Sequence, residues 1–258
     1  MPKVLPPIRY NIGIEVAYRR KLTALIKQMN DAVRKAVLDT YSENEPKIAM
    51  DATPSEQLRL ILKKISKRWI KEFDELSDKM AKHFATDVAK RSDASLRNAL
   101  RKHGMAIEFK PTAAMKDVMG ATVQQNVSLI KSIPEQYLKG VEGMVMRSVQ
   151  VGGDLQKLSE DLQKTYGVSK RRAALIARDQ NIKATSAMNR ARQLEIGVEE
   201  AIWVHSHAGK EPRPTHVKNN GKRYDVKKGW YDPAVKDHIF PGQLINCRCT
   251  SRSVIPGL

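Results

Sequence analysis

Cysteine is scarce in this sequence: its 258 residues include only two, Cys247 and Cys249, separated by a single residue. A disulfide across so short a gap would be strained, so nothing in the sequence indicates an oxidising compartment. The N-terminus has no apolar segment of the kind that directs secretion, and no stretch is apolar enough to span a membrane. We therefore expect a protein that is made and kept in a cytoplasm-like environment and has no membrane partner.

Aromatic residues are also few, at 5% of the chain, although hydrophobic residues of all kinds make up 41%. The core must then be packed mainly by Ala, Leu, Ile, Val and Met, which suits helices better than sheets. Long stretches place apolar residues at helical spacing, which argues against disorder. We expect a mainly helical protein.

Common enzymatic motifs are missing as well: there is no Gly-rich phosphate loop, nucleophile elbow or His-Glu-x2-His helix. What the chain has in excess is positive charge, with a formal net charge of +18 that is spread along its whole length. Such a chain favours a polyanionic partner, most commonly nucleic acid, although solubility alone is the alternative. We therefore predict no enzymatic activity, no required cofactor, and contact with double-stranded DNA that is independent of sequence.

The first 110 residues form a basic helical region. Leu22, Ile26, Met29 and Val33 are typical of the repeat that predicts a helix over residues 14–40, followed by a break from Tyr41 onward. Two further helices are expected over residues 53–84 and 85–102, the second ending before Gly104.

Residues 111–196 form a second helical group. Pro134 predicts a boundary between two helices, and the Gly-Val-Ser sequence at 167–169 predicts a turn whose serine caps a long helix over residues 169–196. A turn before a basic helix is also found in helix-turn-helix proteins, so a host DNA-binding regulator is one alternative.

The composition changes after Gly197. Residues 197–258 are rich in Gly and Pro and hold four of the six histidines and both cysteines. Short strands are expected over residues 200–205, 222–226 and 249–255. The expected fold is therefore mainly α with a small C-terminal α+β module: long amphipathic helices followed by a short-stranded, loop-rich domain.

Two sets of side chains are candidates for binding. The basic face of the long helix could contact phosphates, the alternative being a solvated helix face; its candidate residues are Arg171, Arg172, Arg178, Lys183 and Arg190. In the C-terminal module, Cys247 and Cys249 are on one face of a strand, and with His216 they could hold zinc. Free thiols in a reduced protein are the alternative, because the spacing matches no standard zinc motif.

The chain must turn back between the cysteines and the Pro-Arg-Pro-Thr-His sequence for the module to close. We therefore expect Arg213 and His216 to meet Cys247 and Cys249, with or without a metal, and Arg213 to donate to backbone carbonyls near the strand. A second interpretation groups His205 and His216 with Asn219 and Asn220, as in metal-dependent nucleases. A DNA-processing enzyme that uses this His/Cys cluster is therefore the alternative function.

Several motifs follow one another between about residues 120 and 252. In the helical part they are Asn126 to Tyr137, Tyr166-Gly-Val-Ser169, Arg172-Ala, Ile176-Ala-Arg-Asp-Gln180 and Asn189-x-Ala-Arg192. In the module they include Gly197-Val, Pro212 to His216, Asn220 to Lys222, Pro241-Gly and Cys247 to Cys249, and the motif residues are Trp203, Arg213, His216, Gly221, Pro241, Cys247, Arg248 and Cys249. Their order and spacing resemble the phage Mu protein F-like head morphogenesis proteins.

The resemblance implies a minor head protein of a tailed bacteriophage. Such a protein is structural, works with the portal protein and other head proteins, and lies in the host cytoplasm during assembly and then in the virion, inside the head or near the portal. Many family members carry an acidic residue and a further arginine just before the Arg-x2-His element, where this chain has Gly209 and Glu211.

Overall fold

The computed structural model describes residues 3–43, 54–150, 155–209 and 211–255. The chain divides into two compact units. The helical unit comprises residues 16–81 and 125–177, and the sheet unit comprises residues 1–15, 82–124 and 178–258. Of the three segments recognised in the sequence, 197–258 lies wholly in the sheet unit, whereas each of the other two contributes to both units.

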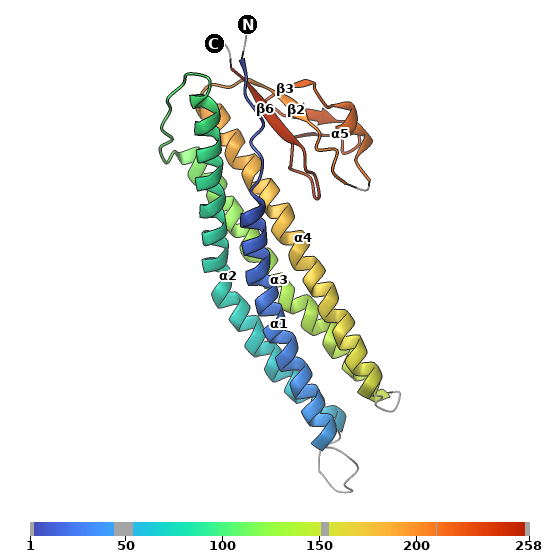
Figure 1. Cartoon of the computed structure of the whole chain (residues 1–258). Helices are drawn as coiled ribbons and strands as arrows, with labels where there is room; N and C mark the ends of the chain where they lie inside the picture. The colour runs from blue at the N-terminus through green and yellow to red at the C-terminus, as the bar shows by residue number, and fades with distance from the viewer. Residues whose placement is uncertain (1–2, 44–53, 151–154, 210, 256–258) are drawn as a thin grey trace. The chain divides into compact units, whose positions relative to one another are not determined.

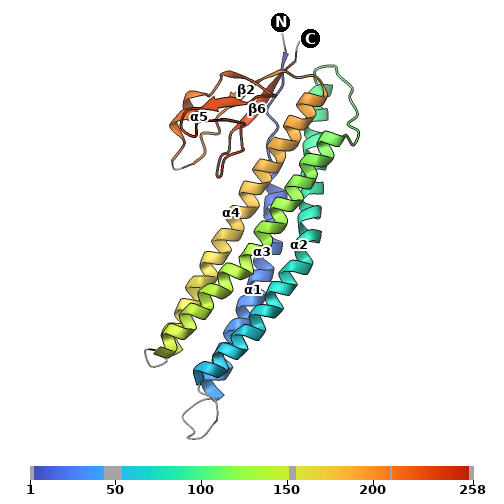
Figure 2. The ribbon, with the colours of Figure 1, turned by 180° about the vertical axis from the view of Figure 1, so that it is seen from behind.

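Four long helices account for most of the described chain: α1 (Ile12–Glu43), α2 (Pro54–Arg101), α3 (Ala113–Gln150) and α4 (Leu155–Glu195). In the helical unit their segments lie side by side (Figures 1 and 2). The apolar stripe expected in the first helix is buried in this unit, together with Leu62, Phe73, Ile130, Tyr137 and Leu158 from the others. The first expected helix is confirmed, but it continues to Glu43, so the break does not begin at Tyr41 as expected; the rest of the expected break lies outside the described residues.

The expected division of the second helix near residue 84 is wrong, because α2 is continuous from Pro54 to Arg101. Phe84, Ala85 and Val88 are all buried, so the apolar stripe passes through the expected junction without interruption. The helix ends where expected: Gly104 has a φ of 85°, and the amide of Met105 donates to the carbonyl of Leu100, an arrangement typical of a glycine C-cap.

The expected boundary at Pro134 is also wrong, since Pro134 lies inside α3. A proline in a helix interior costs about 3 kcal/mol because it removes a backbone hydrogen bond. Ile130, Ile133 and Tyr137 are buried on either side of it, and each buried apolar side chain contributes about 1.5–3 kcal/mol. Packing therefore outweighs the local preference, and the helix continues.

The turn expected at residues 166–169 does not form, because α4 runs unbroken from Leu155 to Glu195. Leu162 and Ala173 are both buried, one on each side of the expected turn, and a bend there would remove one of them from the core. The helix-turn-helix considered from the sequence is therefore absent at this position.

The sheet unit holds four antiparallel strands in the order β1-β6-β2-β3. These are β1 (Lys3–Val4), β6 (Thr250–Ile255), β2 (Glu200–Val204) and β3 (Arg223–Asp225). The last three confirm the strands expected from the sequence. The first was not expected: Lys3 pairs with Ile255, so the two ends of the described chain lie next to each other (Figure 1).

A smaller hairpin and a short helix complete the sheet unit. Strands β4 (Trp230–Asp232) and β5 (Asp237–Ile239) pair with each other, and α5 spans Pro214–Lys218. Trp203, on β2, is fully buried in an apolar cluster that also contains Leu5 and Leu100. The expected fold class, mainly α with a small C-terminal α+β module, is confirmed. Within the described ranges, no helix combines the length and apolar character required to cross a bilayer.

Candidate metal centre

Two sulfur atoms and one nitrogen atom that could bind a metal lie close together inside the sheet unit. His216 lies on α5, and Cys247 and Cys249 lie just before β6, not on the strand as expected. The Nδ1 atom of His216 is 3.4 Å from the Sγ of Cys247 and 3.7 Å from the Sγ of Cys249. All three side chains are buried, and their donor atoms lie within 4.8 Å of one another. The contact expected across thirty residues of sequence is therefore confirmed.

Arg213 holds the loop that makes this meeting possible. Its Nη2 donates a hydrogen bond to the backbone carbonyl of Ile245, 3.0 Å away, as the sequence predicted. The following Pro214 begins α5, where a proline costs nothing because the first amide of a helix has no partner within it. The Pro-Arg-Pro-Thr-His sequence thus presents His216 to the cysteines.

The other nitrogen of His216 faces a buried carboxylate that the sequence did not reveal. Its Nε2 lies 3.4 Å from Oδ2 of Asp232, which has no exposed surface. Asp232 accepts hydrogen bonds from the amide of Ala234 at 2.9 Å and the hydroxyl of Thr215 at 3.3 Å. No pattern in the sequence placed Asp232 beside His216.

Aromatic rings fix the orientation of the His216 ring. The Trp203 ring lies edge-on with its centroid 5.1 Å away, and the Trp230 ring lies edge-on at 6.4 Å. Trp203 is a family motif residue without a polar role that could be read from the sequence. Its position shows that it forms the apolar wall of the site.

The two thiols have unequal acidity. The hydrogen bond between them lowers the pKa of Cys247, and the bond to His216 lowers it further, against the effect of burial. The same pairing, with burial, raises the pKa of Cys249.

A cavity of about 400 Å³ adjoins the three donors. Its lining includes the motif residues Arg213 and Arg248, together with Arg178 and His205. The backbone amide of His205 donates to Asn220 Oδ1, and its Nδ1 accepts from the amide of His207 at 3.2 Å. Asn220 therefore positions the loop beside His205, and His205 lines the same cavity as His216.

The basic residues of α4 in the sheet unit have local partners. Arg178 donates to Oδ1 of Asn246 at 3.2 Å. Lys183 pairs with Asp179 at 2.8 Å, and Asp179 also accepts from the Asn246 amide at 2.8 Å. These side chains hold the loop that carries Cys247 against the helix, a role that their regular spacing in the sequence did not indicate.

Three other basic candidates differ in exposure. The guanidinium of Arg190 lies over the Phe240 ring, 3.7 Å from its centroid, and burial lowers its pKa. In the helical unit, Arg172 donates to Ser132 Oγ at 2.8 Å. Arg171 is exposed. Of the five candidates for nucleic-acid contact, Arg171 is therefore the one that is exposed, and the other four are partly buried.

The glycines of the motifs occupy turns that require them. Gly242, after Pro241, has a φ of 80°, and a Cβ there would lie 3.1 Å from the Cβ of Ser186 and 3.2 Å from a methyl of Ile182. The hydroxyl of Ser186 also donates to the Pro241 carbonyl. Gly221, with a φ of 80°, donates its amide to the Trp203 carbonyl at 2.8 Å. These motif residues therefore shape the loops around the site.

The chain is mainly helical with a small antiparallel module, in which a histidine and a Cys-x-Cys pair meet at one buried point. Residues 139–252 match the sequence profile of the family described as "Phage Mu protein F like protein". This segment, somewhat less than half of the chain, is therefore similar to that family. The motif at Asn126–Tyr137 lies before the matched segment, whereas the others lie inside it.

One relative adds the N-terminal part to this comparison. The chain is 28% identical over 262 residues to an uncharacterized protein of Haemophilus influenzae, covering 96% of this chain and 55% of the relative. The chain thus spans about half the length of that relative. No solved structure matches the chain.

Proposed function

We propose that this chain is a structural minor head protein of a tailed bacteriophage. The observation that carries the proposal is the family match over residues 139–252, in which the motif residues His216, Cys247 and Cys249 meet at one buried point. These residues position loops and pack one another, as the contacts of Trp203, Gly221 and Gly242 illustrate. The chain works in the host cytoplasm while heads assemble and is then carried in the virion.

Within that role, the chain associates with the portal protein and with other head proteins. It also contacts packaged double-stranded DNA without sequence preference. The net charge of +18 supports this contact, as do exposed cations on the helical unit, which include Arg171, Lys63, Lys64 and Lys67. In this setting the charge contributes affinity for phosphates at many positions and requires no base-specific groove contacts.

Affinity purification during head assembly tests the portal association. The full chain, tagged at its own locus, should co-purify with the portal protein after washing at high salt, which removes partners held by exposed charge alone. It should also be present in purified particles. Its absence from particles, together with normal head assembly when its gene is deleted, would contradict the proposal.

A metal-dependent nuclease is the alternative, favoured by the cavity beside His205 and the two cysteines. Purified full-length chain should leave plasmid DNA intact when zinc, magnesium or manganese is added. Metal-dependent cleavage that is lost in a His205→Ala variant would establish the enzyme instead.

A further inference from the structure

We propose that His216, Cys247 and Cys249 bind a single zinc ion through Nδ1 and the two Sγ atoms. The site is independent of the proposed role in the head, because it rests only on the contacts inside the sheet unit.

The spacing of the donors fits a tetrahedral ion. With zinc–sulfur bonds of about 2.3 Å and zinc–nitrogen bonds of about 2.0–2.1 Å, tetrahedral angles put nitrogen and sulfur about 3.6 Å apart. The observed distances from Nδ1 of His216 are 3.4 Å to Cys247 and 3.7 Å to Cys249. A neutral imidazole nitrogen has one hydrogen or one lone pair, so the Nδ1 of His216 can hydrogen-bond to one of the two sulfurs and not to both. A cation between the three atoms satisfies all of them.

The surroundings of His216 resemble those of a histidine ligand. A ligating imidazole usually directs its second nitrogen at a carboxylate, which fixes the ring and its tautomer. The Oδ2 of Asp232 lies on this side of the ring, 3.4 Å from Nε2 but without a hydrogen bond to it, and Asp232 is itself held by Thr215 and Ala234. A proton on Nε2 leaves the lone pair on Nδ1 directed at the cysteines.

The donor set selects the ion. Two thiolates and an imidazole favour zinc over magnesium or calcium, which prefer oxygen ligands. The donors are almost completely enclosed, at 2–4% relative exposure, where unpaired thiolate charge is costly. A divalent cation offsets the charge that both sulfurs acquire on losing their protons.

The fourth position opens toward the cavity of about 400 Å³. His205 also lines this cavity, but its Nδ1 already accepts the His207 amide. A neutral ring with an accepting Nδ1 carries its proton on Nε2 and is a donor, not a ligand. The fourth ligand is therefore water, with His205 able to donate to it.

Metal analysis of the full chain, purified under reducing conditions without chelator, tests the site. We expect about one zinc per chain, with two sulfur and two nitrogen or oxygen neighbours by X-ray absorption. His216→Ala, Cys247→Ser and Cys249→Ser should each lose the ion, and Asp232→Asn should bind it about 10–100-fold more weakly. His238→Ala is the matched control, because His238 is exposed on β5, and it should retain zinc.

Because a cysteine variant can fail to fold, the wild-type chain supplies the second test. After chelation it should take up cobalt and show thiolate-to-metal charge-transfer absorption. A folded wild-type chain that holds no zinc and shows no such band with cobalt would overturn the proposal. Full zinc occupancy in the Cys247→Ser/Cys249→Ser double variant, or four sulfur neighbours, would overturn it as well. Failure here leaves portal association unaffected, so the two proposals are tested separately.

Discussion

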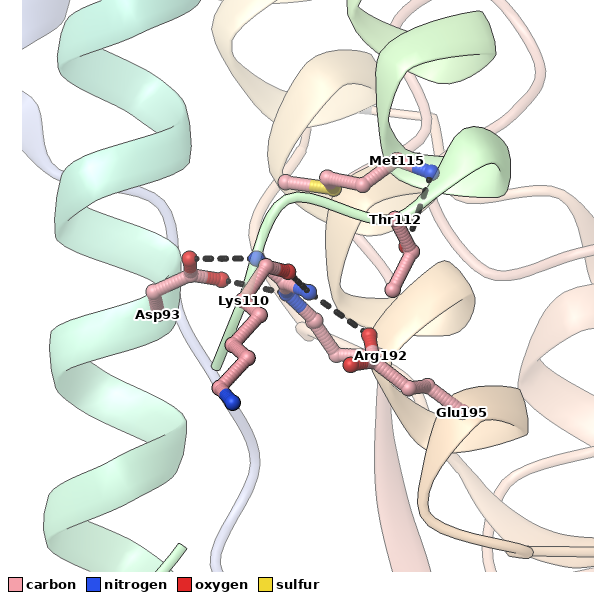
Figure 3. Close-up of polar contacts among 6 residues, drawn as sticks. All are labelled: Asp93, Lys110, Thr112, Met115, Arg192 and Glu195. Atoms are coloured by element: carbon pink, nitrogen blue, oxygen red, sulfur yellow. Dashed lines mark hydrogen bonds and ion pairs between the residues drawn. The ribbon is translucent and has the colours of Figure 1, made fainter. Parts of the chain in front are cut away.

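Arg192 is the most completely paired charge in the described part of the sheet unit. Its guanidinium makes two parallel hydrogen bonds to Asp93 on α2, at 2.9 and 2.8 Å (Figure 3). It also donates to the Lys110 carbonyl at 2.8 Å and to Glu195 at 2.6 Å. These carboxylates raise its pKa against the effect of burial. In the sequence Arg192 is one more cation on a basic helix, yet it joins α2, α4 and the segment between α2 and α3.

Replacing Arg192 should therefore cost stability. Arg192→Ala leaves the carboxylate of Asp93, which is only 18% exposed, without its cation. We therefore expect a loss of about 3 kcal/mol or more in the free energy of unfolding. Arg192→Lys should lose less, because lysine keeps the charge but not the paired geometry. Chemical denaturation measures both losses.

Arg97→Ala is the matched control, since Arg97 is exposed on α2. Its effect should lie within about 0.5 kcal/mol. Equal stability of the Arg192→Ala and Arg97→Ala variants would show that the Arg192 contacts contribute nothing.

At the scale of elements, the helices are longer than local preference indicates. The signals at Pro134 and Gly167 each favour a break, but both lie within continuous helices. Local preferences amount to about 1 kcal/mol for glycine and 3 kcal/mol for proline. Burial of apolar residues on both sides of each signal exceeds those amounts, and it depends on neighbours that are remote in sequence.

Two glycine substitutions distinguish a glycine that only lowers local helix preference, Gly167, from one that the tertiary structure requires, Gly242. A Cβ at Gly167 would meet only the tip of Arg171, at 3.7 Å, so Gly167→Ala should stabilise the protein by about 0.5–1 kcal/mol. Gly242→Ala, with its positive φ and crowded surroundings, should destabilise it by about 1–3 kcal/mol. Thermal unfolding of the two variants checks both signs. Destabilisation by Gly167→Ala would indicate a turn at residues 166–169 after all.

At the scale of the whole molecule, charge is the dominant feature. Some of the positive charges are paired with carboxylates within the protein, as those of Lys183 and Arg192 are. Exposed cations such as Lys63, Lys64 and Lys67 of α2 face solvent instead. We therefore expect the proposed contact with DNA to depend on exposed cations, of which Arg171 is the one among the five candidates on α4.

The salt dependence of duplex binding tests this distribution. Reversing Lys63, Lys64 and Lys67 to glutamate should reduce the slope of log affinity against log salt by about 3, since each phosphate contact contributes about 1. Arg171→Glu should reduce it by about 1 more. Fluorescence anisotropy with two unrelated duplexes measures the slope, and circular dichroism checks that the variants remain folded. Binding that is insensitive to salt, or absent at low salt, would contradict DNA contact.

Much of the C-terminal module could be predicted because its signals are local. Glycine and proline mark its turns, and alternation marks the strands that became β2, β3 and β6. The meeting of His216 with the cysteines followed from closure of the chain between them. The short strands β4 and β5 were missed, because three residues are too few to show a pattern.

By itself the sequence determined the helical class, the C-terminal strands, the family motifs and the donors of the candidate metal site. Only the tertiary structure decided that α3 and α4 continue through Pro134 and Gly167, that β1 pairs with β6, and that Asp232 faces His216. It also decided which arginines form the ion pairs and hydrogen bonds that join one element to another. The reason is physical: caps, turns and periodicity act over a few residues, whereas burial, strand pairing and charge pairing join residues up to 252 positions apart, as Lys3 and Ile255 are.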